Sequence, residues 1–386
     1  MRICRVAISY PTTDSPGAGL VAYYLCKHIM MPTIYLTIRR DGDMSPSPSP
    51  NIVIEAMDIP IEKSSLALNH SLHKPNLNRV QRFLVYIKIA LSGRSIKFLA
   101  HSIPIIIRFR PDIICCHSNL TLYIGLFFNL FYRKKFVFHI HAMSDAIAIC
   151  NLPILRWMVN RASRIYCISE SVRDKLKYVI PFYKLKLTST GVDPNVFYRI
   201  NSPKKKQIIQ VGQLMWYKGH RYLLEAMPAI LSKHPDYQLI IVGKGQLKSE
   251  ISEFIKDNGL SESIKMVSNL THGELRVLYN ESMLLVMPSL FEGLPKVLLE
   301  AFSCGLPAVI TKSCNAKNIS AGRAIIVEKE SSSALAEAVC CILDDHLMWK
   351  TFSKNCVDII HTHDWKIISK NIFEDYRKVL YSNNYT

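Results

Sequence analysis

The chain has 386 residues, of which 49% are hydrophobic and 20% charged, and its formal net charge is +18. A chain of this length exceeds one ordinary hydrophobic core, so we expect two domains of nearly equal size. The 11 cysteines include no C-x-x-C pair, which argues against a zinc site or a disulfide framework and favours reduced thiols in a cytosol.

The first half of the chain alternates short apolar runs with helical patterns, beginning with a run that Arg5 interrupts. Such a short, broken run favours a first strand over a signal peptide. The alternation predicts a parallel sheet covered by helices on both faces. Residues 41–50 are typical of a Pro/Ser turn, so we reject Asp41-Gly42-Asp43 as a metal site. Strands are expected at 3–9, 33–38, 52–56, 112–116, 136–141 and 164–168, and a helix at 20–31.

Basic residues are concentrated in the first half. Residues 63–110 contain nine Lys or Arg and no Asp or Glu, and residues 79–91 place apolar side chains every three or four positions between basic ones. This pattern predicts an amphipathic helix that anionic headgroups attract, at roughly 1 kcal/mol per basic side chain near the bilayer. We therefore expect residues 63–144 to contact an anionic membrane surface. No nucleic-acid-binding motif is present, so nucleic acid is not an expected partner.

A bilayer-spanning helix needs about 18 uninterrupted apolar residues, and no run in this sequence reaches that length. The closest, residues 120–132, is expected to form a buried helix. Contact with a membrane would therefore be peripheral.

The strand–helix rhythm restarts after a polar, basic linker at residues 201–207. We therefore place a boundary between a first domain, residues 1–198, and a second domain, residues 199–365. Strands are expected at 207–214, 237–242, 264–267, 283–288, 308–311 and 324–327, and helices at 220–231, 246–257, 272–282 and from 332 onward.

The most specific pattern lies between Ser289 and Pro307, where Glu292 and Glu300 stand eight residues apart. Glu292 follows an expected strand, and Glu300 lies about a turn and a half into the helix that Pro295 can open. The N-terminus of that helix offers unpaired N–H groups to a diphosphate. The two carboxylates can accept hydrogen bonds from sugar and ribose hydroxyls. The arrangement suits a nucleotide sugar.

This pattern resembles the E-x7-E motif of glycosyltransferase family 4. The stretches around Lys218 and around Gly243 are similar to two other signatures of that family. The resemblance implies the α/β GT-B fold, in which two Rossmann-like, doubly wound domains face each other across a cleft. It also implies that residues 366–386 form a C-terminal helix that crosses back to the first domain.

The resemblance implies catalytic roles for His141, Glu292 and Lys218, with Lys218 on the diphosphate and Glu292 on the sugar. Glu300 would hold the ribose. His139, two residues before His141 on the same strand face, is an alternative for the histidine beside the sugar. The substrate-binding set would be Gly17, Gly19, Gly212, Lys218, Gly243, Gly245, Glu292, Gly293, Leu294, Pro295 and Glu300.

The implied activity is retaining transfer of a sugar from a nucleoside-diphosphate sugar to an acceptor hydroxyl, without a metal or another cofactor. The basic first domain suggests a lipid-linked saccharide acceptor in bacterial surface polysaccharide or lipopolysaccharide biosynthesis, at the cytoplasmic face of the inner membrane. The alternatives are a nucleotide-sugar epimerase of the same architecture and a non-enzymatic, membrane-associated scaffold.

Two departures from the family pattern concern the donor. Gln213 stands where the family usually has Arg, so Lys218 would work with another basic residue, such as Lys244. Residues 312–323 also differ from the family at a loop that often faces the donor. The sugar and the base of the donor therefore stay open.

Overall fold

The computed structural model forms two compact units, Met1–Ser189 with Trp365–Thr386, and Thr190–Asp364. Its described residues are 1–6, 24–25, 27–28, 31–39, 50–58, 93–141, 143–268, 270–292 and 295–381. Several sequence-based predictions therefore lie outside the described residues: Gly17, Gly19, Gly293, Leu294, the turn up to residue 49 and the amphipathic pattern at 79–91.

The unit boundaries differ from those expected. The first lies between Ser189 and Thr190, before the predicted 198/199, because Val192 and Phe197 are buried in the core of the second unit. The second lies between Asp364 and Trp365, one residue before the predicted 365/366. The last helix belongs to the first unit.

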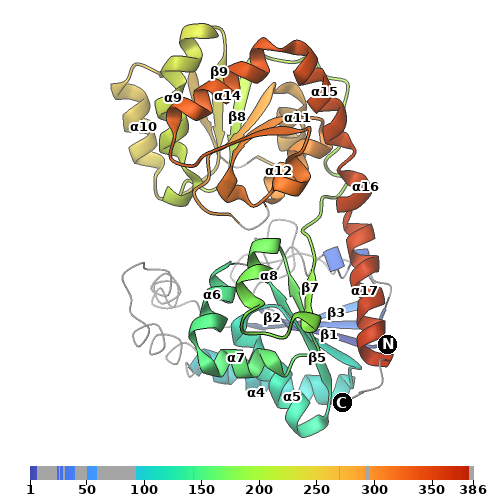
Figure 1. Ribbon diagram of the computed structural model, residues 1–386. Coiled ribbons are helices and arrows are strands. Elements are labelled where there is room, and N and C mark those ends of the chain that lie inside the picture. Colours follow the sequence, from blue (N-terminus) through green and yellow to red (C-terminus); the bar gives the residue numbers. More distant parts are fainter. Residues whose placement is uncertain are drawn as a thin grey trace. The chain divides into compact units, whose positions relative to one another are not determined.

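The first unit, in which Figure 1 labels strands β1, β2, β3, β5 and β7, is built on a parallel sheet. The order of its seven described strands is β3-β2-β1-β4-β5-β6-β7. Its inner strands are buried on both faces, as expected when helices cover both sides of a sheet. The strands are β1 Ile3–Val6, β2 Thr33–Arg39, β3 Ile52–Asp58, β4 Ile113–Cys116, β5 Lys135–Ile140, β6 Arg164–Cys167 and β7 Leu185–Leu187.

Helices cover the two faces of this sheet very differently. One face packs on a group of helices through Phe128, Ile149 and Leu155. The other packs on the last helix, α17 Trp365–Tyr381, through Trp365 and Tyr376. The helices and 3-10 turns of the first unit before α17 are α4 Gly93–Phe109, the 3-10 turn η1 Asn119–Thr121, α5 Leu122–Tyr132, α6 Met143–Asn151, α7 Pro153–Asn160, α8 Glu170–Leu176 and the 3-10 turn η2 Phe182–Lys184.

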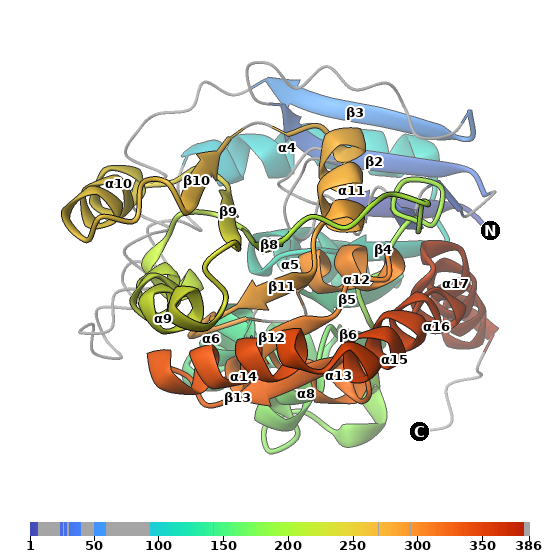
Figure 2. The same cartoon turned by 90° about the horizontal axis from the view of Figure 1, so that it is seen from above.

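The second unit is built on a parallel sheet of six described strands in the order β10-β9-β8-β11-β12-β13 (Figure 2). Alternate residues face two separate cores, since Ile208 packs in one and Ile209 in the other. The strands are β8 Gln207–Val211, β9 Gln238–Val242, β10 Ile264–Val267, β11 Leu284–Met287, β12 Ala308–Thr311 and β13 Ala324–Val327.

The helices of the second unit divide between these two cores. Leu223 and Val339 pack in the core that contains Ile208. Phe302 and Tyr279 pack in the core that contains Ile209. The helices are α9 His220–Lys233, α10 Lys248–Asp257, α11 His272–Glu281, α12 Lys296–Ser303, α13 Lys317–Ser320, α14 Ser332–Asp344, α15 His346–Val357 and α16 Ile360–His363, with 3-10 turns η3 Trp216–Lys218 and η4 Lys312–Cys314.

The helix expected at 120–132 is only partly buried. Leu122 and Phe128 lie in the core, but Phe131 at the end of α5 is 71% exposed. The prediction of a buried helix is therefore wrong for its last turn. In the part of the chain that the structure describes, no helix has the length and apolar character needed to cross a bilayer.

Candidate functional site

Three neighbouring strands of the second unit end at one edge of its sheet. Gly243 follows β9, Gly212 follows β8, and Pro288 follows β11. Because the strands are parallel and adjacent, their carboxyl ends share that edge. The turn η3, which ends at Lys218, and the loop that carries Glu292 lie at the same edge. Sequence positions 74 residues apart therefore meet here.

Lys218 and Glu292 form an ion pair in which the Lys218 Nζ contacts the Glu292 Oε1. The side chains are 17% and 12% exposed, so water screens the pair only weakly. The Ser289 hydroxyl donates to the same carboxylate oxygen over 3.1 Å. The site thus presents a cation and an anion side by side, a combination that suits a ligand with a phosphate next to hydroxyl groups.

The backbone around Glu292 is held by the segment after β12. The Glu292 N–H donates to the Ser313 carbonyl over 3.1 Å, and the Asn315 side-chain amide donates to the Glu292 carbonyl over 2.7 Å. Thr311 donates from its hydroxyl to the Ser289 carbonyl over 2.5 Å. Sequence reasoning missed these supporting residues. The available signal was their position, directly after the strand next to β11.

Two glycines allow the strand ends to approach closely. A Cβ on Gly243 would stand 1.8 Å from the Gly212 carbonyl oxygen, and one on Gly219 would stand 2.0 Å from the Pro288 carbonyl oxygen. Gly219 also has φ +66°, which L-residues with side chains rarely adopt. These contacts bring the turn after β8 against the loop after β11, and that approach is what brings Lys218 within reach of Glu292.

Gln213 stands where the family usually has Arg, and its side chain contacts Tyr217. Its Oε1 accepts a hydrogen bond from the Tyr217 hydroxyl over 2.9 Å, and its carbonyl oxygen lies 3.0 Å from the His220 Nε2. The Lys244 residue, considered as a second cation, is exposed. Lys218 is therefore the cation that directly contacts Glu292.

Glu300 lies inside α12, the helix that begins directly after Pro295, and it is only 3% exposed. Its Oε2 accepts a hydrogen bond from the Tyr279 hydroxyl over 3.2 Å, and its Oε1 lies 3.6 Å from the Lys296 Nζ. An ionised carboxylate has about four acceptor positions, so these contacts leave capacity for one more hydroxyl.

His141 lies in the first unit, directly after β5, as expected from the sequence. Its Nε2 is 3.1 Å from the Nδ1 of His117, which follows the neighbouring strand β4. Burial lowers the pKa of His141 to about 4, so its ring is neutral near pH 7. His139 is instead buried, with its Nε2 2.7 Å from the Tyr376 hydroxyl oxygen. Of the two candidates, His141 is therefore the partly accessible one.

His117 was not predicted from the sequence. The signal that could have found it is its position after the strand at 112–116, next to the strand that ends at His141. The described residues contain no group of three or more His, Cys, Asp or Glu suited to hold a metal ion. None of the ten described cysteines is in a disulfide.

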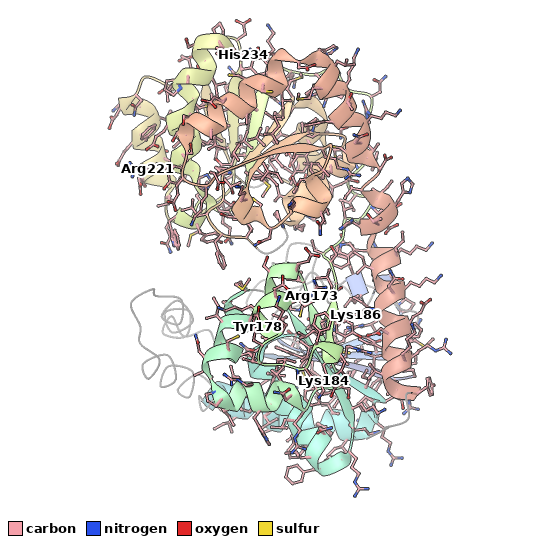
Figure 3. The ribbon with its side chains drawn as sticks, viewed as in Figure 1. Arg173, Tyr178, Lys184, Lys186, Arg221 and His234 are labelled. Carbon is pink, nitrogen blue, oxygen red and sulfur yellow. The ribbon has the colours of Figure 1, made fainter. Side chains whose placement is uncertain are left out.

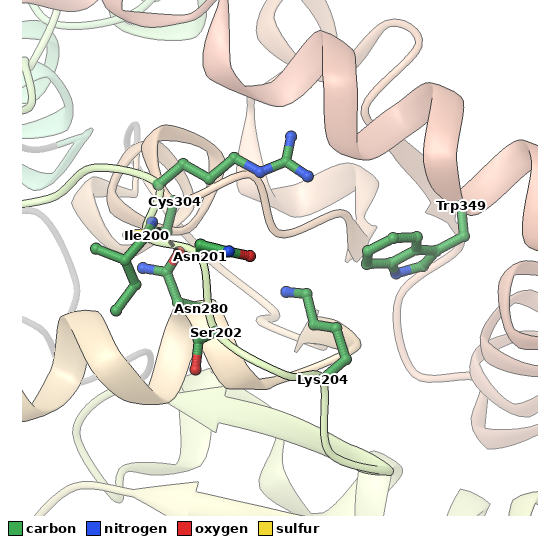
Figure 4. Close-up of a pocket in the computed structure, with 8 residues that line it drawn as sticks. Ile200, Asn201, Ser202, Lys204, Asn280, Cys304 and Trp349 are labelled. Carbon is green, nitrogen blue, oxygen red and sulfur yellow. Dashed lines mark hydrogen bonds between the residues drawn. The ribbon is translucent and has the colours of Figure 1, made fainter.

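A pocket lies elsewhere in the second unit (Figure 4). Lys204 lies over the Trp349 ring there, and its Nζ donates to the Ser282 carbonyl over 2.8 Å. These residues precede β8 and β11, so the pocket is at the amino ends of the strands, away from Lys218 and Glu292. Its lining residues are Arg199, Ile200, Asn201, Ser202, Lys204, Asn280, Cys304 and Trp349.

Two family models match consecutive parts of the chain. The model described as glycosyl transferases group 1 matches residues 196–356, and the glycosyltransferase family 4 model matches residues 64–196. The chain belongs to these glycosyltransferases.

Curated relatives of the glycosyltransferase are distant. An uncharacterised glycosyltransferase of Methanocaldococcus jannaschii is 24% identical over 69% of this chain and 75% of its own length. The gpi3 subunit of the phosphatidylinositol N-acetylglucosaminyltransferase of Schizosaccharomyces pombe is 21% identical over 62% of this chain. The match covers 54% of the gpi3 subunit, so the chain spans about half the length of that relative.

Solved structures share the architecture of the glycosyltransferase. A sucrose-phosphate synthase from Thermosynechococcus elongatus is 17% identical, with a TM-score of 0.79 over 99% of this chain and 100% of that one. Anabaena HepE in complex with UDP is 17% identical, with a TM-score of 0.76 over 98% of this chain and 100% of that one. The fold is GT-B, with two Rossmann-like domains, as expected from the sequence.

Proposed function

We propose that the glycosyltransferase moves a sugar, with retention at C1, from a nucleoside-diphosphate sugar to an acceptor hydroxyl without a metal ion. The observation that carries the donor assignment is the Lys218–Glu292 ion pair at the carboxyl ends of β8 and β11. Support also comes from HepE, which has the same fold and whose structures contain UDP or UDP-glucose.

In this proposal the bound donor replaces the ion pair with two separate contacts. The β-phosphate pairs with Lys218 in place of Glu292, and the Glu292 carboxylate then accepts hydrogen bonds from sugar hydroxyls. Stabilisation of the leaving diphosphate by Lys218 strengthens as its charge develops, so it lowers the barrier as well as binding the donor.

The remaining residues position the donor and the acceptor. Glu300 accepts a ribose hydroxyl, and Gly243 and Gly245 let the backbone approach the nucleotide. In this proposal His141 is assigned to the sugar and the acceptor. Gly212 and Pro295 border the same site in the second unit, with Pro295 immediately before the N-terminus of α12.

The test compares two ion pairs at opposite edges of the same sheet. Lys205 and Glu281, 2.5 Å apart, precede β8 and β11 and serve as the control pair. Transfer is measured with a panel of UDP- and GDP-sugars, with and without EDTA. We expect Glu292→Gln and Lys218→Ala to lower kcat/KM roughly a hundredfold, as loss of a preorganised electrostatic contact does. Glu281→Gln should change it little.

The same assays separate the alternatives. Unchanged transfer in both Glu292→Gln and Lys218→Ala would refute the donor site, and loss of transfer in EDTA would refute metal independence. Conversion of a donor sugar with no acceptor present would identify an epimerase. No turnover of any donor would support a scaffold.

We further propose that the acceptor is a lipid-linked saccharide of surface polysaccharide biosynthesis at the cytoplasmic face of a bacterial inner membrane. In the described part of residues 63–144, Arg110 and Arg133 are exposed and precede β4 and β5, and Phe131, two residues before Arg133, is exposed as well. The acidic residue there, Asp112, is already engaged, since its carboxylate accepts from the Arg2 N–H over 2.7 Å. Arg110 and Arg133 thus contribute positive charge at this edge of the sheet, and Phe131 contributes an exposed ring near Arg133.

Basic and aromatic side chains continue on the segment from α8 to β7. Arg173 lies over the Phe182 ring, and Tyr178 is 83% exposed (Figure 3). Lys186 on β7 is exposed, and Lys184 is partly buried, with its Nζ donating to the Asn160 carbonyl over 2.5 Å (Figure 3). Aromatic rings among basic residues are characteristic of proteins that rest at a membrane interface.

Liposome sedimentation tests the membrane proposal. The double variant Arg110→Glu/Arg133→Glu should bind anionic vesicles less than the unmodified chain. The control double variant Lys350→Glu/Lys354→Glu, which reverses two exposed charges of the second unit, should bind normally. Equal binding to neutral and anionic vesicles would contradict the proposal.

A further inference from the structure

The carboxyl ends of β4, β5 and β6 carry a row of stacked rings. The parallel register pairs Cys116 with Phe138, so His117 and His139 follow side by side, and their ring centroids are 4.6 Å apart at 11°. His139 stacks in turn on Tyr166, with centroids 4.4 Å apart at 15°. His117, His139 and Tyr166 are each 1% exposed.

Hydrogen bonds hold the backbone and the middle ring of this row. The His117 backbone N–H donates to the Val6 carbonyl over 3.0 Å. The Tyr376 hydroxyl oxygen, on α17, lies 2.7 Å from the His139 Nε2 and accepts from the Arg5 Nη1 over 3.3 Å. Stacking, burial and these bonds leave the His117 ring little freedom to rotate.

His141 lies at the open end of the row and is held by one bond. Its Nε2 is 3.1 Å from the His117 Nδ1, and the two ring planes differ by 13°. The other ring nitrogen of His141, Nδ1, is buried and has no hydrogen-bond partner among the described residues.

The bond between the two rings determines where their protons lie. Burial lowers the pKa of both histidines, so both rings are neutral and each carries one N–H. Of the two nitrogens that meet, one must donate and the other accept. The tautomers of the two rings are therefore coupled: Nδ1 of His141 is a donor when His117 donates and an acceptor when His117 accepts.

We propose that His117 is a positioning residue, which holds His141 in a single tautomer and orientation and leaves Nδ1 of His141 for the sugar or the acceptor. This inference rests on the proposed function only in assigning His141 to the reaction. His117 itself contacts neither substrate. Its effect on transfer passes through the His141 ring, as an outer partner orients a reacting group.

The test uses three substitutions of His117 in the full chain. Phe retains a stacking ring without a nitrogen. Asn places an amide near the position of Nδ1, and Gln places it near that of Nε2. Because one hydrogen bond contributes about 0.5–1.5 kcal/mol, we expect His117→Phe to lower kcat roughly three- to tenfold. His117→Asn should recover more of the activity than His117→Gln.

Nitrogen-15 NMR of the histidine side chains supplies a readout that loss of packing alone would not produce. The His141 signals, assigned by their absence from His141→Ala, should show one neutral tautomer in the unmodified chain and an averaged pair in His117→Phe. A tautomer mixture already present in the unmodified chain would overturn the inference.

Failure of the site assignment gives a different result. If His117→Phe changed the His141 tautomer but His141→Ala transferred sugar at the normal rate, the contact would be real and His141 would lie outside the reaction. Equal activity of the Asn and Gln variants, with the tautomer unchanged in both, would instead refute the positioning role.

Discussion

Three histidines gather in the first unit without a carboxylate partner in the contacts described above. Desolvation lowers the pKa of His117 and His139 well below the usual value and that of His141 to about 4. The folded state therefore keeps these rings uncharged. At low pH the unfolded state binds protons on them more strongly, which favours unfolding.

Stability should consequently depend on pH in the mildly acidic range. Between about pH 4 and the ordinary imidazole value near 6.5, the unfolded chain binds more protons than the folded one. The free energy of unfolding should be largest above pH 6.5 and fall as the pH decreases through this window. Denaturant unfolding at pH 7.5 and pH 5.0 measures the difference.

A matched variant isolates the contribution of the cluster. His220 and His363 shift in the same direction, so the whole chain loses stability for several reasons. His117→Phe removes one ring that must stay neutral and should lose less stability between the two pH values. A loss as large as that of the unmodified chain would contradict this account.

Individual residues of the site could be recognised from the sequence, but their contacts could not. Glu292 and Lys218 each belong to a motif, whereas their ion pair depends on strand order, since β8 and β11 are neighbours only in the folded sheet. Asn315 and His117 are in no motif quoted above. Their roles depend on which strand ends meet, and local sequence does not specify that.

At the scale of elements, the apolar runs of the second unit predicted its strands closely. β10, β12 and β13 have the predicted bounds. β7 was missed, because its three residues, Leu185–Leu187, include a lysine and are mostly exposed. A short edge strand has only one neighbour to satisfy and needs no continuous apolar run.

Helix α17 completes the core of a unit whose other elements come much earlier in the chain. Trp365 is 1% exposed and stacks on Tyr24 with ring centroids 5.0 Å apart. Lys135, at the start of β5, donates from its Nζ to the Val379 carbonyl over 2.8 Å. The helix is thus an integral part of the first unit.

Substitutions in α17 should therefore differ sharply in their effect. Trp365→Ala removes a buried ring and should lower the free energy of unfolding by about 3–5 kcal/mol. Ile367→Ala, in the same helix at 37% exposure, should lower it by about 0.5 kcal/mol or less. Guanidinium unfolding measures both, and similar losses would show that α17 packs differently.

At the scale of the whole molecule, the two units differ in continuity. The second is one uninterrupted segment with its own two cores, and the first requires residues from both ends of the chain. The sequence indicated two domains through the restart of the strand–helix rhythm. It placed the first boundary too late because Val192 and Phe197 follow the last strand of one unit yet pack in the other.

Because only the second unit is a single segment, the two units should differ in whether they fold as isolated fragments. Residues 190–364 should fold alone and unfold in one cooperative transition, and a segment of residues 1–189 should not, because it lacks Trp365 and Tyr376. Circular dichroism and thermal denaturation of both fragments test this. Cooperative unfolding of 1–189 would show that α17 is dispensable.

The basic side chains at Arg110 and Arg133 precede the strands that His117 and His141 follow, so they occupy opposite ends of β4 and β5. At roughly 3.3 Å per residue, the six residues of β5 separate these ends by about 20 Å. A chain that rested on headgroups through its arginines, with β5 along the membrane normal, would hold His141 that far above the lipid. Glycans several sugars long should then be extended faster than a single lipid-proximal sugar.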